Sequence, residues 1–331
     1  MAFIHDVIRL WKVLTYVRVR NYLSIKWSYH WSKFTKKIIH KGLPSFISVE
    51  PTTQCNLKCP QCFTTDKGFT RPKGMLDSET FEKILQQASP FAFYLNLYFQ
   101  GEPFLNKDLM RFVAKAKQTN LYVSISTNAH YLSAENINGI MDSGLDKIIV
   151  SLDGADAETY QEYRKGGDFN KVIEGIKALV AAKKQKRRNH PFIELQFLLH
   201  KKNEAQLAQI KAFKKTMGID KVAIKSMQLI HFEQAADWLP EEQSRYTVSG
   251  DGSVHIKKEL HNFCYRMWNS CVITWNGDVV PCCFDKNADH AFGNINDRNL
   301  KEIWNSQPYN DFRKKVFTQR KDIEICRNCN E

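Results

Sequence analysis

Between residues 46 and 228, short apolar runs alternate with longer segments whose apolar residues recur at helical spacing. The runs are five to eight residues long and rich in β-branched and aromatic side chains, which is typical of buried strands. The expected strands are 46–50, 93–99, 121–127, 147–153, 192–199 and 221–227. The expected helices are 77–88, 107–118, 133–143, 168–183 and 204–217. Because strands that alternate with helices pair in parallel through right-handed crossovers, the pattern predicts an α/β fold, as a barrel or an open sheet.

The first 40 residues show a second kind of pattern, in which apolar and aromatic residues recur at helical spacing with basic residues between them. The apolar positions are Ile4, Ile8, Trp11 and Leu14, then Leu23, Trp27, Trp31, Phe34 and Ile38. No uncharged apolar run approaches the ~18–20 residues that a spanning helix needs. Two interpretations remain open: an amphipathic helix at a membrane surface, or a helix that packs its aromatic face on the domain.

After residue 228 the periodicity weakens, and 231–262 is expected to be a linker. The dipeptide Asn276-Gly277 between β-rich arms predicts a hairpin over 272–280, and a helix is expected over 299–317. The chain is therefore expected to have four parts. They are an amphipathic helical extension at 1–44, an α/β domain at 45–230, the linker, and a small cysteine-rich domain at 263–331.

The formal charge of +13 invites a nucleic-acid interpretation, but most of this charge lies in one place. Residues 1–44 hold nine Lys and Arg against one acid, Asp6, which gives a net charge of +8 for this segment. The basic run 183–188 ends an expected helix, where cations complement the helix dipole in a solvated turn. A nucleic-acid partner is therefore not expected.

Nine cysteines fall into two groups, with none between residues 62 and 264. Gaps of two and three residues, in a long chain without a recognisable signal peptide, predict metal sites in a reducing, cytoplasmic compartment. The first group is Cys55, Cys59 and Cys62, directly after the first expected strand. Three thiolates leave one iron of a four-iron cube open, whereas a zinc ion would need a fourth ligand such as a distant histidine. The spacing alone leaves both alternatives open.

This C-x3-C-x2-C loop after the first strand resembles the cluster loop of the radical S-adenosylmethionine (SAM) superfamily. The resemblance implies a partial (β/α)6 TIM-like barrel with a [4Fe–4S] cluster whose open iron is chelated by SAM. It further implies reductive cleavage of SAM to methionine and a 5′-deoxyadenosyl radical, which abstracts hydrogen from a substrate.

Other positions extend the resemblance. Gly101 and Glu102 belong to an element similar to the Gly-Gly-Glu-Pro motif that meets the SAM amino group, with Gln100 in place of the first glycine. Ser151 and Asp153 lie in an element similar to one near the ribose.

The position of Arg164 resembles that of an arginine for the SAM carboxylate, and Ser126 and Asn128 are further candidates for SAM contacts. Gln61 occupies a place that is usually aromatic in the family, and Phe63 is expected to stack on adenine instead.

The second group resembles the SPASM or twitch extension of the same superfamily, which implies an auxiliary [4Fe–4S] cluster with four protein thiolates. The expected ligands are Cys264, Cys282, Cys326 and Cys329. Cys271 is expected in the core, and Cys283 is an alternative to Cys282. Four cysteines with a terminal C-x2-C also suit zinc, which is the alternative here.

Together these resemblances imply a radical SAM enzyme that acts on a peptide or a small polyol-like molecule and draws electrons from a reductant such as flavodoxin or ferredoxin. Residues 1–40 offer peripheral contact with the inner face of the membrane. The alternative is a zinc-stabilised, non-enzymatic protein that binds a membrane surface or RNA through its basic arm.

Overall fold

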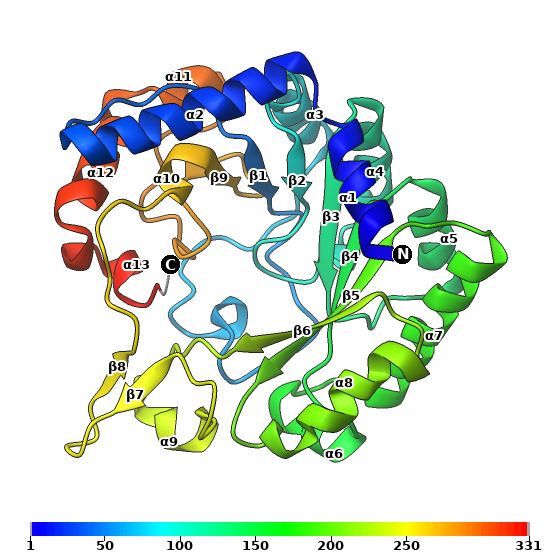
Figure 1. Cartoon of the computed structure of the whole chain (residues 1–331). Coiled ribbons are helices and arrows are strands. Elements are labelled where there is room, and N and C mark those ends of the chain that lie inside the picture. Colours follow the sequence, from blue (N-terminus) through cyan, green and yellow to red (C-terminus); the bar gives the residue numbers. More distant parts are fainter. Residues whose placement is uncertain (1, 330–331) are drawn as a thin grey trace.

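A computed structural model describes residues 2–329 and contains one large sheet of eight strands (Figure 1). Six neighbouring strands follow chain order and pair in parallel. They are β1 (Phe46–Val49), β2 (Tyr94–Asn96), β3 (Tyr122–Thr127), β4 (Lys147–Ser151), β5 (Phe192–Leu199) and β6 (Lys221–Ser226). Each matches an expected strand, so the predicted parallel α/β fold is confirmed.

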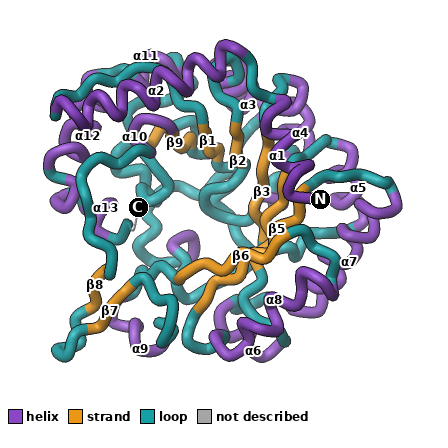
Figure 2. The backbone as a smooth tube through the Cα atoms, viewed as in Figure 1, coloured by secondary structure: helices purple, strands orange, loops and turns teal. Residues whose placement is uncertain are grey.

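The helices between these strands lie outside the curved row of strands, as Figure 2 shows. They are α3 (Ser78–Ala88), α4 (Leu109–Gln118), α5 (Ala134–Asp142), α6 (Ala157–Tyr163), α7 (Phe169–Gln185) and α8 (Leu207–Thr216). Side-chain caps set several helix starts: Asp77, Ser133 and Asp168 each accept a backbone N–H of the first turn. The sequence analysis missed α6, whose seven residues are too few for a clear periodic signal.

The main core lies between the sheet and this outer layer of helices. Ile47, Leu95 and Val123 from neighbouring strands pack with Phe81 and Phe112 of α3 and α4. Because successive strand residues point to opposite faces, the alternate positions of the same strands turn toward the inside of the barrel. Some of those positions are polar, among them Ser48, Asn96 and Ser124, whereas Phe46, Tyr94 and Tyr122 form an aromatic layer nearer the amino ends of the strands. The barrel therefore has an apolar outer surface under the helices and a lumen of mixed character, with polar groups from β1, β2 and β3.

The expected C-terminal hairpin is confirmed, and it joins the same sheet. Strand β9 (Ser270–Ile273) pairs in parallel with β1, and β10 (Val279–Val280) pairs antiparallel with β9. The helices of this region are α10 (Arg266–Asn269), α11 (Leu300–Trp304), α12 (Gln307–Thr318) and α13 (Glu324–Arg327). The expectation of one helix over 299–317 is wrong, because α11 ends at Trp304 and Ser306 caps a new helix by accepting the Tyr309 N–H.

The stretch expected to be a linker has structure of its own. It contains α9 (Ala235–Trp238) and an antiparallel pair, β7 (Tyr246–Val248) and β8 (Val254–Ile256). The Tyr246 hydroxyl accepts the Leu229 N–H and donates to Asn328 Oδ1 at 2.5 Å. This tyrosine therefore ties the hairpin to the end of the barrel and to the C-terminal cysteine segment.

Helices α1 (Ala2–Lys12) and α2 (Tyr16–Thr35) cover the amino ends of the strands. Val13 packs on Phe93 and Tyr122 there. The buried Arg18 guanidinium donates to the Ser89 and Thr119 carbonyls, at 2.7 and 2.9 Å. Since these residues end α3 and α4, the cation lies at two negative helix termini. Among the described residues, no helix is long and apolar enough to cross a membrane.

Candidate active site and auxiliary metal centre

The first three cysteines lie on the loop that leaves β1, at the carboxyl ends of the parallel strands. Cys59 is buried, whereas Cys55 and Cys62 are partly exposed beside a cavity of about 380 Å³. Backbone contacts shape this loop: the Cys62 N–H donates to the Cys59 carbonyl at 3.1 Å, and the Lys58 N–H donates to the Lys165 carbonyl at 3.0 Å. None of the nine cysteines forms a disulfide among the described residues, so no disulfide competes for these thiols.

Burial makes two of these thiols weak acids when no metal is bound. It raises the pKa of Cys55 to about 11 and that of Cys59 to about 12. Iron must therefore displace protons from both groups when a cluster forms. Arg164 acts in the opposite direction, because its Nη1 lies 4.0 Å from Cys59 Sγ and favours the thiolate.

Gly101 and Glu102 lie against the same loop. Gly101 has a φ of +72°, and an added Cβ would lie 2.5 Å from the Thr52 carbonyl oxygen, so only glycine fits. The buried Glu102 carboxylate accepts the Asn128 N–H and the Thr127 hydroxyl, both at 2.7 Å. Burial raises the pKa of Glu102 above its ordinary value, and these hydrogen bonds oppose that shift.

The two departures from the family pattern have structural explanations. Gln100 Oε1 accepts the Thr64 hydroxyl at 2.6 Å, and its buried Nε2 has no hydrogen-bond partner among the described residues. Gln61 is buried, and its Oε1 accepts the Ile230 N–H at 2.7 Å, so it fastens the cysteine loop to the segment after β6. Its amide cannot stack as an aromatic ring would. Phe63, the expected substitute, packs edge-on against Phe69.

The structure brings most of the remaining predicted SAM contacts to the cysteine loop. Asp153 Oδ2 accepts Arg164 Nε at 2.5 Å. Burial alone would lower the pKa of Arg164, but Asp153 and Cys59 together raise it above its ordinary value. Asn128 Nδ2 donates to Asn56 Oδ1 at 2.8 Å and lies 3.9 Å from Cys55 Sγ.

The two predicted serines are less closely tied to the loop. Ser151 ends β4 just before Asp153 and is buried. Ser126 lies on β3 and is partly exposed.

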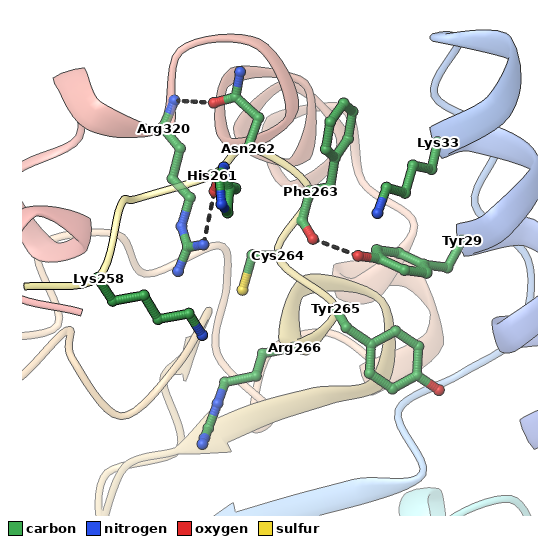
Figure 3. A pocket seen from close by; sticks show the side chains of 10 residues that line it. All are labelled: Tyr29, Lys33, Lys258, His261, Asn262, Phe263, Cys264, Tyr265, Arg266 and Arg320. Carbon is green, nitrogen blue, oxygen red and sulfur yellow. Dashed lines mark hydrogen bonds between the residues drawn. The ribbon is translucent and has the colours of Figure 1, made fainter. Parts of the chain in front are cut away.

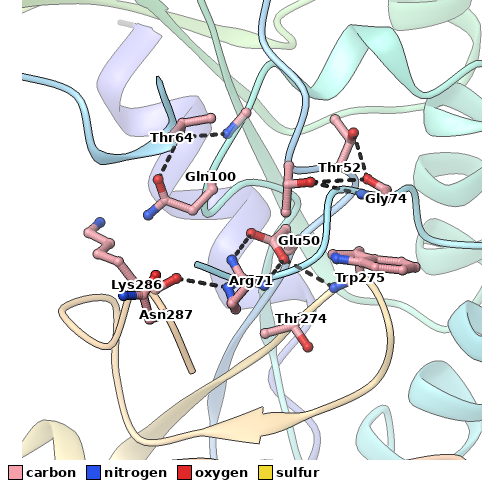
Figure 4. Close-up of polar contacts among 12 residues, drawn as sticks. Glu50, Thr52, Thr64, Arg71, Gly74, Gln100, Thr274, Trp275, Lys286 and Asn287 are labelled. Atoms are coloured by element: carbon pink, nitrogen blue, oxygen red, sulfur yellow. Dashed lines mark hydrogen bonds and ion pairs between the residues drawn. The ribbon is translucent and has the colours of Figure 1, made fainter. Parts of the chain in front are cut away.

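Sequence reasoning missed a buried ion pair that joins this loop to the C-terminal hairpin (Figure 4). The Glu50 carboxylate, at the end of β1, accepts one hydrogen bond from each terminal nitrogen of Arg71, from Nη2 at 2.7 Å and from Nη1 at 2.8 Å. The same carboxylate accepts the Trp275 N–H at 3.2 Å, and Arg71 Nε donates to the Lys286 carbonyl at 2.8 Å. Glu50 is the last residue of the expected strand 46–50, but its partner lies 21 residues away in a segment without periodicity. No local signal could have paired them.

The second group of cysteines also gathers in space. Burial raises the pKa of Cys282 well above its ordinary value, and the neighbouring thiols Cys283, Cys264 and Cys326 add to the shift. Burial raises the pKa of Cys326 to about 11, and the nearby thiols Cys264 and Cys329 add to this shift. Cys264 faces a cavity of about 570 Å³ whose basic lining includes Lys33, Lys258 and Arg320 (Figure 3). Arg320, which lines this cavity with Cys264, also donates from Nη2 to Cys329 Sγ at 3.3 Å, so the predicted auxiliary ligands lie in one neighbourhood.

The two remaining cysteines differ in their surroundings. Cys271 is buried in the main core, as expected. Cys283 is partly exposed, lies 3.7 Å from Arg266 Nη1, and borders a cavity of about 280 Å³ on the lumen side of β1 and β9.

Both groups of cysteines fit iron–sulfur clusters in their donor sets, three thiols beside an open cavity and four thiols together. In residues 2–329, no three His, Cys, Asp or Glu side chains converge on a point that could hold a single metal ion. A four-iron cluster binds each thiolate at a different iron, so its cysteines do not converge on one point.

This arrangement defines a partial β/α barrel with two separate groups of cysteines, and comparison with known proteins gives the family. Residues 49–194 match the radical SAM superfamily, and residues 264–330 match the SPASM iron–sulfur cluster-binding domain. The chain belongs to the radical SAM superfamily and carries a C-terminal SPASM domain. These domains imply a SAM-binding [4Fe–4S] cluster and auxiliary iron–sulfur binding.

Two curated relatives cover most of the chain. A tungsten-containing aldehyde ferredoxin oxidoreductase cofactor-modifying protein of Pyrococcus furiosus is 26% identical over 317 residues, 86% of each chain. A PqqA peptide cyclase of Gluconobacter oxydans is 27% identical over 311 residues, 86% of this chain and 82% of the relative. The first is named as a cofactor-modifying protein and the second as a peptide cyclase. The comparisons thus support the enzyme and not the zinc-stabilised, non-enzymatic alternative.

Two solved structures confirm the fold. Streptococcus suis SuiB bound to S-adenosylmethionine has a TM-score of 0.65 at 15% identity, over 91% of this chain and 75% of that one. BtrN in complex with AdoMet and 2-DOIA has a TM-score of 0.56 at 22% identity, over 88% of this chain and 95% of that one.

Proposed function

We propose that the barrel, residues 45–230, cleaves SAM at a cluster held by Cys55, Cys59 and Cys62, and that the resulting radical modifies a polar substrate in the lumen. The observation that carries this proposal is the open three-thiol loop at the carboxyl ends of the strands, surrounded by Gly101, Glu102, Asn128, Asp153 and Arg164. In β/α barrels the chemistry is built on the loops at this end.

The bound cluster supplies the electron that cleaves SAM to methionine and a 5′-deoxyadenosyl radical. The protein's own residues hold the cofactor in place. Gly101 lets the backbone approach the SAM amino group closely. Glu102 accepts a hydrogen bond from that amino group. Arg164, oriented by Asp153, supplies positive charge for the SAM carboxylate, and Ser126, Asn128 and Ser151 complete the contacts.

The lumen cavity supports a substrate group of limited size. Its volume of about 280 Å³ is below the usual range for a whole drug-sized ligand, about 300–1,000 Å³. Its lining includes Ser48, Asn96, Arg266 and Asn269, and the Oδ1 atoms of both asparagines are buried without a partner among the described residues. This suits a polar peptide side chain or a small polyol.

The two kinds of substrate also occur among the similar proteins. One curated relative is named as a peptide cyclase, and SuiB has been crystallised with a precursor peptide. BtrN was crystallised with 2-DOIA, a small molecule.

The auxiliary domain, residues 263–331, is proposed to hold a second [4Fe–4S] cluster with Cys264, Cys282, Cys326 and Cys329. This cluster would exchange electrons with the substrate radical, and the enzyme would take its electrons from a flavodoxin or ferredoxin. Nine cysteines that form no disulfide among the described residues support a reducing, cytoplasmic compartment.

Anaerobic reconstitution followed by reduction in the presence of SAM tests this proposal. Wild-type protein should release 5′-deoxyadenosine, and Cys59→Ser should release none. The matched variant Cys326→Ser should still cleave SAM, because its thiol belongs to the other centre, but it should not turn over substrate. If Cys59→Ser cleaved SAM, or if only Cys326→Ser failed to cleave SAM, the roles assigned to the two cysteine groups would have to be exchanged.

A further inference from the structure

The two N-terminal helices carry a second set of large apolar side chains on the face that is turned away from the protein. Eleven of the fourteen exposed large hydrophobic side chains in the described chain lie between residues 3 and 34. Trp11, Trp27 and Phe34 are 69%, 50% and 79% exposed. A helix of a globular protein normally buries this kind of stripe, so the arrangement is inverted.

The inner face of α2 holds the helix on the protein with residues other than the exposed stripe. Ile25, Ser28 and Ser32 are fully buried, and Asn21 exchanges two hydrogen bonds of 2.8 Å with Leu43. The buried Arg18 adds hydrogen bonds, and the inward-facing Tyr22 and Tyr29 pack edge-on against aromatic rings of the domain. The aromatic stripe seen in the sequence is therefore not the face that packs on the domain.

Positive charge surrounds the exposed stripe. Lys12, Arg20, Lys26, Lys37 and Lys41 are exposed. The one acid of this segment, Asp6, is not part of that surface, because its carboxylate accepts the Tyr122 hydroxyl. Lys41 Nζ lies 4.9 Å above the Trp27 ring, at the edge of a groove of about 480 Å³ that is also lined by Arg20 and Leu23.

We propose that this outer face of α1 and α2 docks on an anionic lipid bilayer, with the aromatic side chains in the interface and the basic side chains at the lipid phosphates. Tryptophan beside lysine and arginine on one helix face is the composition that interfacial helices use. Charge complementarity selects this occupant. A second copy of the chain would bring a segment of net charge +8 against another of the same charge, whereas an anionic leaflet attracts both helices.

This docking fixes the orientation of the enzyme. The helices cover the amino ends of the strands, and the Cys55–Cys62 loop lies at their carboxyl ends. The mouth of the barrel thus faces away from the lipid and stays open to substrate from solution. The auxiliary centre lies nearer the membrane, since Tyr29 and Lys33 of α2 line the cavity at Cys264 (Figure 3).

Co-sedimentation of the reconstituted full-length protein with vesicles tests the proposal. We expect binding to vesicles of phosphatidylcholine mixed with phosphatidylglycerol, weak binding to phosphatidylcholine alone, and a decrease with added salt. The variant Leu23→Ser/Trp27→Ser/Trp31→Ser should lower the partition coefficient more than tenfold, because each large apolar group adds to binding. Its matched control is Phe232→Ser/Val248→Ser, which removes exposed apolar groups elsewhere and should bind as the wild type does.

Two further variants, each without three basic side chains, separate the electrostatic contribution to binding from that of aromatic insertion. Arg20→Gln/Lys26→Gln/Lys41→Gln should weaken binding roughly fivefold per residue, by the usual gain from one basic residue near an anionic surface. Lys177→Gln/Lys184→Gln/Arg187→Gln removes the same charge from exposed positions on and just after α7 and should not weaken it.

SAM cleavage, measured in parallel, should be unchanged in every variant, which shows that each is folded and keeps this test independent of the proposed reaction. Equal binding to neutral vesicles, no binding at all, or wild-type binding by the Trp27 and Trp31 variant would overturn the proposal. The proposal would also be overturned if light scattering showed that the wild type is a dimer and that the same variant is a monomer. In that case a second copy of the chain would cover this face.

Discussion

The buried ion pair between Glu50 and Arg71 gives a prediction whose size follows from its geometry. Glu50 is fully buried and Arg71 nearly so, with side-chain exposures of 0% and 7%. Arg71→Met removes two charge-assisted hydrogen bonds of 2.7 and 2.8 Å and leaves a carboxylate without its counter-charge. Breaking such a pair on one side costs about 3–5 kcal/mol, a large part of the roughly 5–15 kcal/mol by which domains are stable.

The assay is anaerobic urea unfolding of the reconstituted protein, followed by circular dichroism. The double variant Glu50→Gln/Arg71→Met removes the orphaned charge as well and should recover about half of the loss or more. Arg111→Met is the matched control, because its ion pair with Asp108 is exposed on both sides, and it should change the free energy of unfolding by about 0.5 kcal/mol or less.

The reasoning would be refuted by a loss below about 1 kcal/mol for Arg71→Met, similar to that of the exposed pair. It would also be refuted by a double variant that is as unstable as the sum of its single changes. Either result would mean that the pair does not join the cysteine loop to the C-terminal hairpin as a unit.

Three further predictions concern the site and its surroundings. Gly101→Ala should destabilise the protein by about 1–3 kcal/mol and weaken SAM cleavage, since its Cβ would meet the Thr52 carbonyl, whereas Gly250→Ala, with no atom within 4 Å, should be neutral in both assays; equal effects would contradict the close approach. Arg164→Met should raise the SAM concentration needed for cleavage at least tenfold, and Lys165→Met, exposed beside it, should not; matching titrations of 5′-deoxyadenosine formation would exclude a cofactor role for Arg164. Burial lowers the pKa of His40 to about 3 and that of His200 to about 4, so below the unfolded value of about 6.5 the unfolded chain binds more protons. Stability is therefore fully present above pH 6.5 and falls toward pH 4, by up to about 1.4 kcal/mol per pH unit for each histidine; urea midpoints that do not change between pH 7 and pH 5 would contradict this.

The sequence predicts the barrel well because each strand and helix carries its own local pattern. All six barrel strands, the hairpin at 272–280 and the cysteine loop follow from apolar periodicity, a turn dipeptide and cysteine spacing. Elements of three to seven residues were missed: α6, α9, β7 and β8 are too short for periodicity to show.

Contacts between side chains that are far apart in the chain could not be predicted from the sequence either. Arg71 meets Glu50, and Gln61 meets the backbone at Ile230, across gaps that no local signal spans. The sequence shows the apolar stripe of the N-terminal helices, but it does not show whether this stripe faces the domain or the solvent. Only the structure shows that Ser28 and Ser32 are buried, with hydrogen bonds to residues 39–41, while Trp27 and Trp31 are exposed.

Iron and sulfide content of the anaerobically reconstituted chain tests the central claim most directly, namely that it holds one open and one closed four-iron cluster. The account predicts about eight irons per wild-type chain, and about four in either Cys59→Ser or Cys326→Ser. Each variant should lose the cluster of its own site. A colourless wild-type chain with about two zinc ions and no iron would contradict the account.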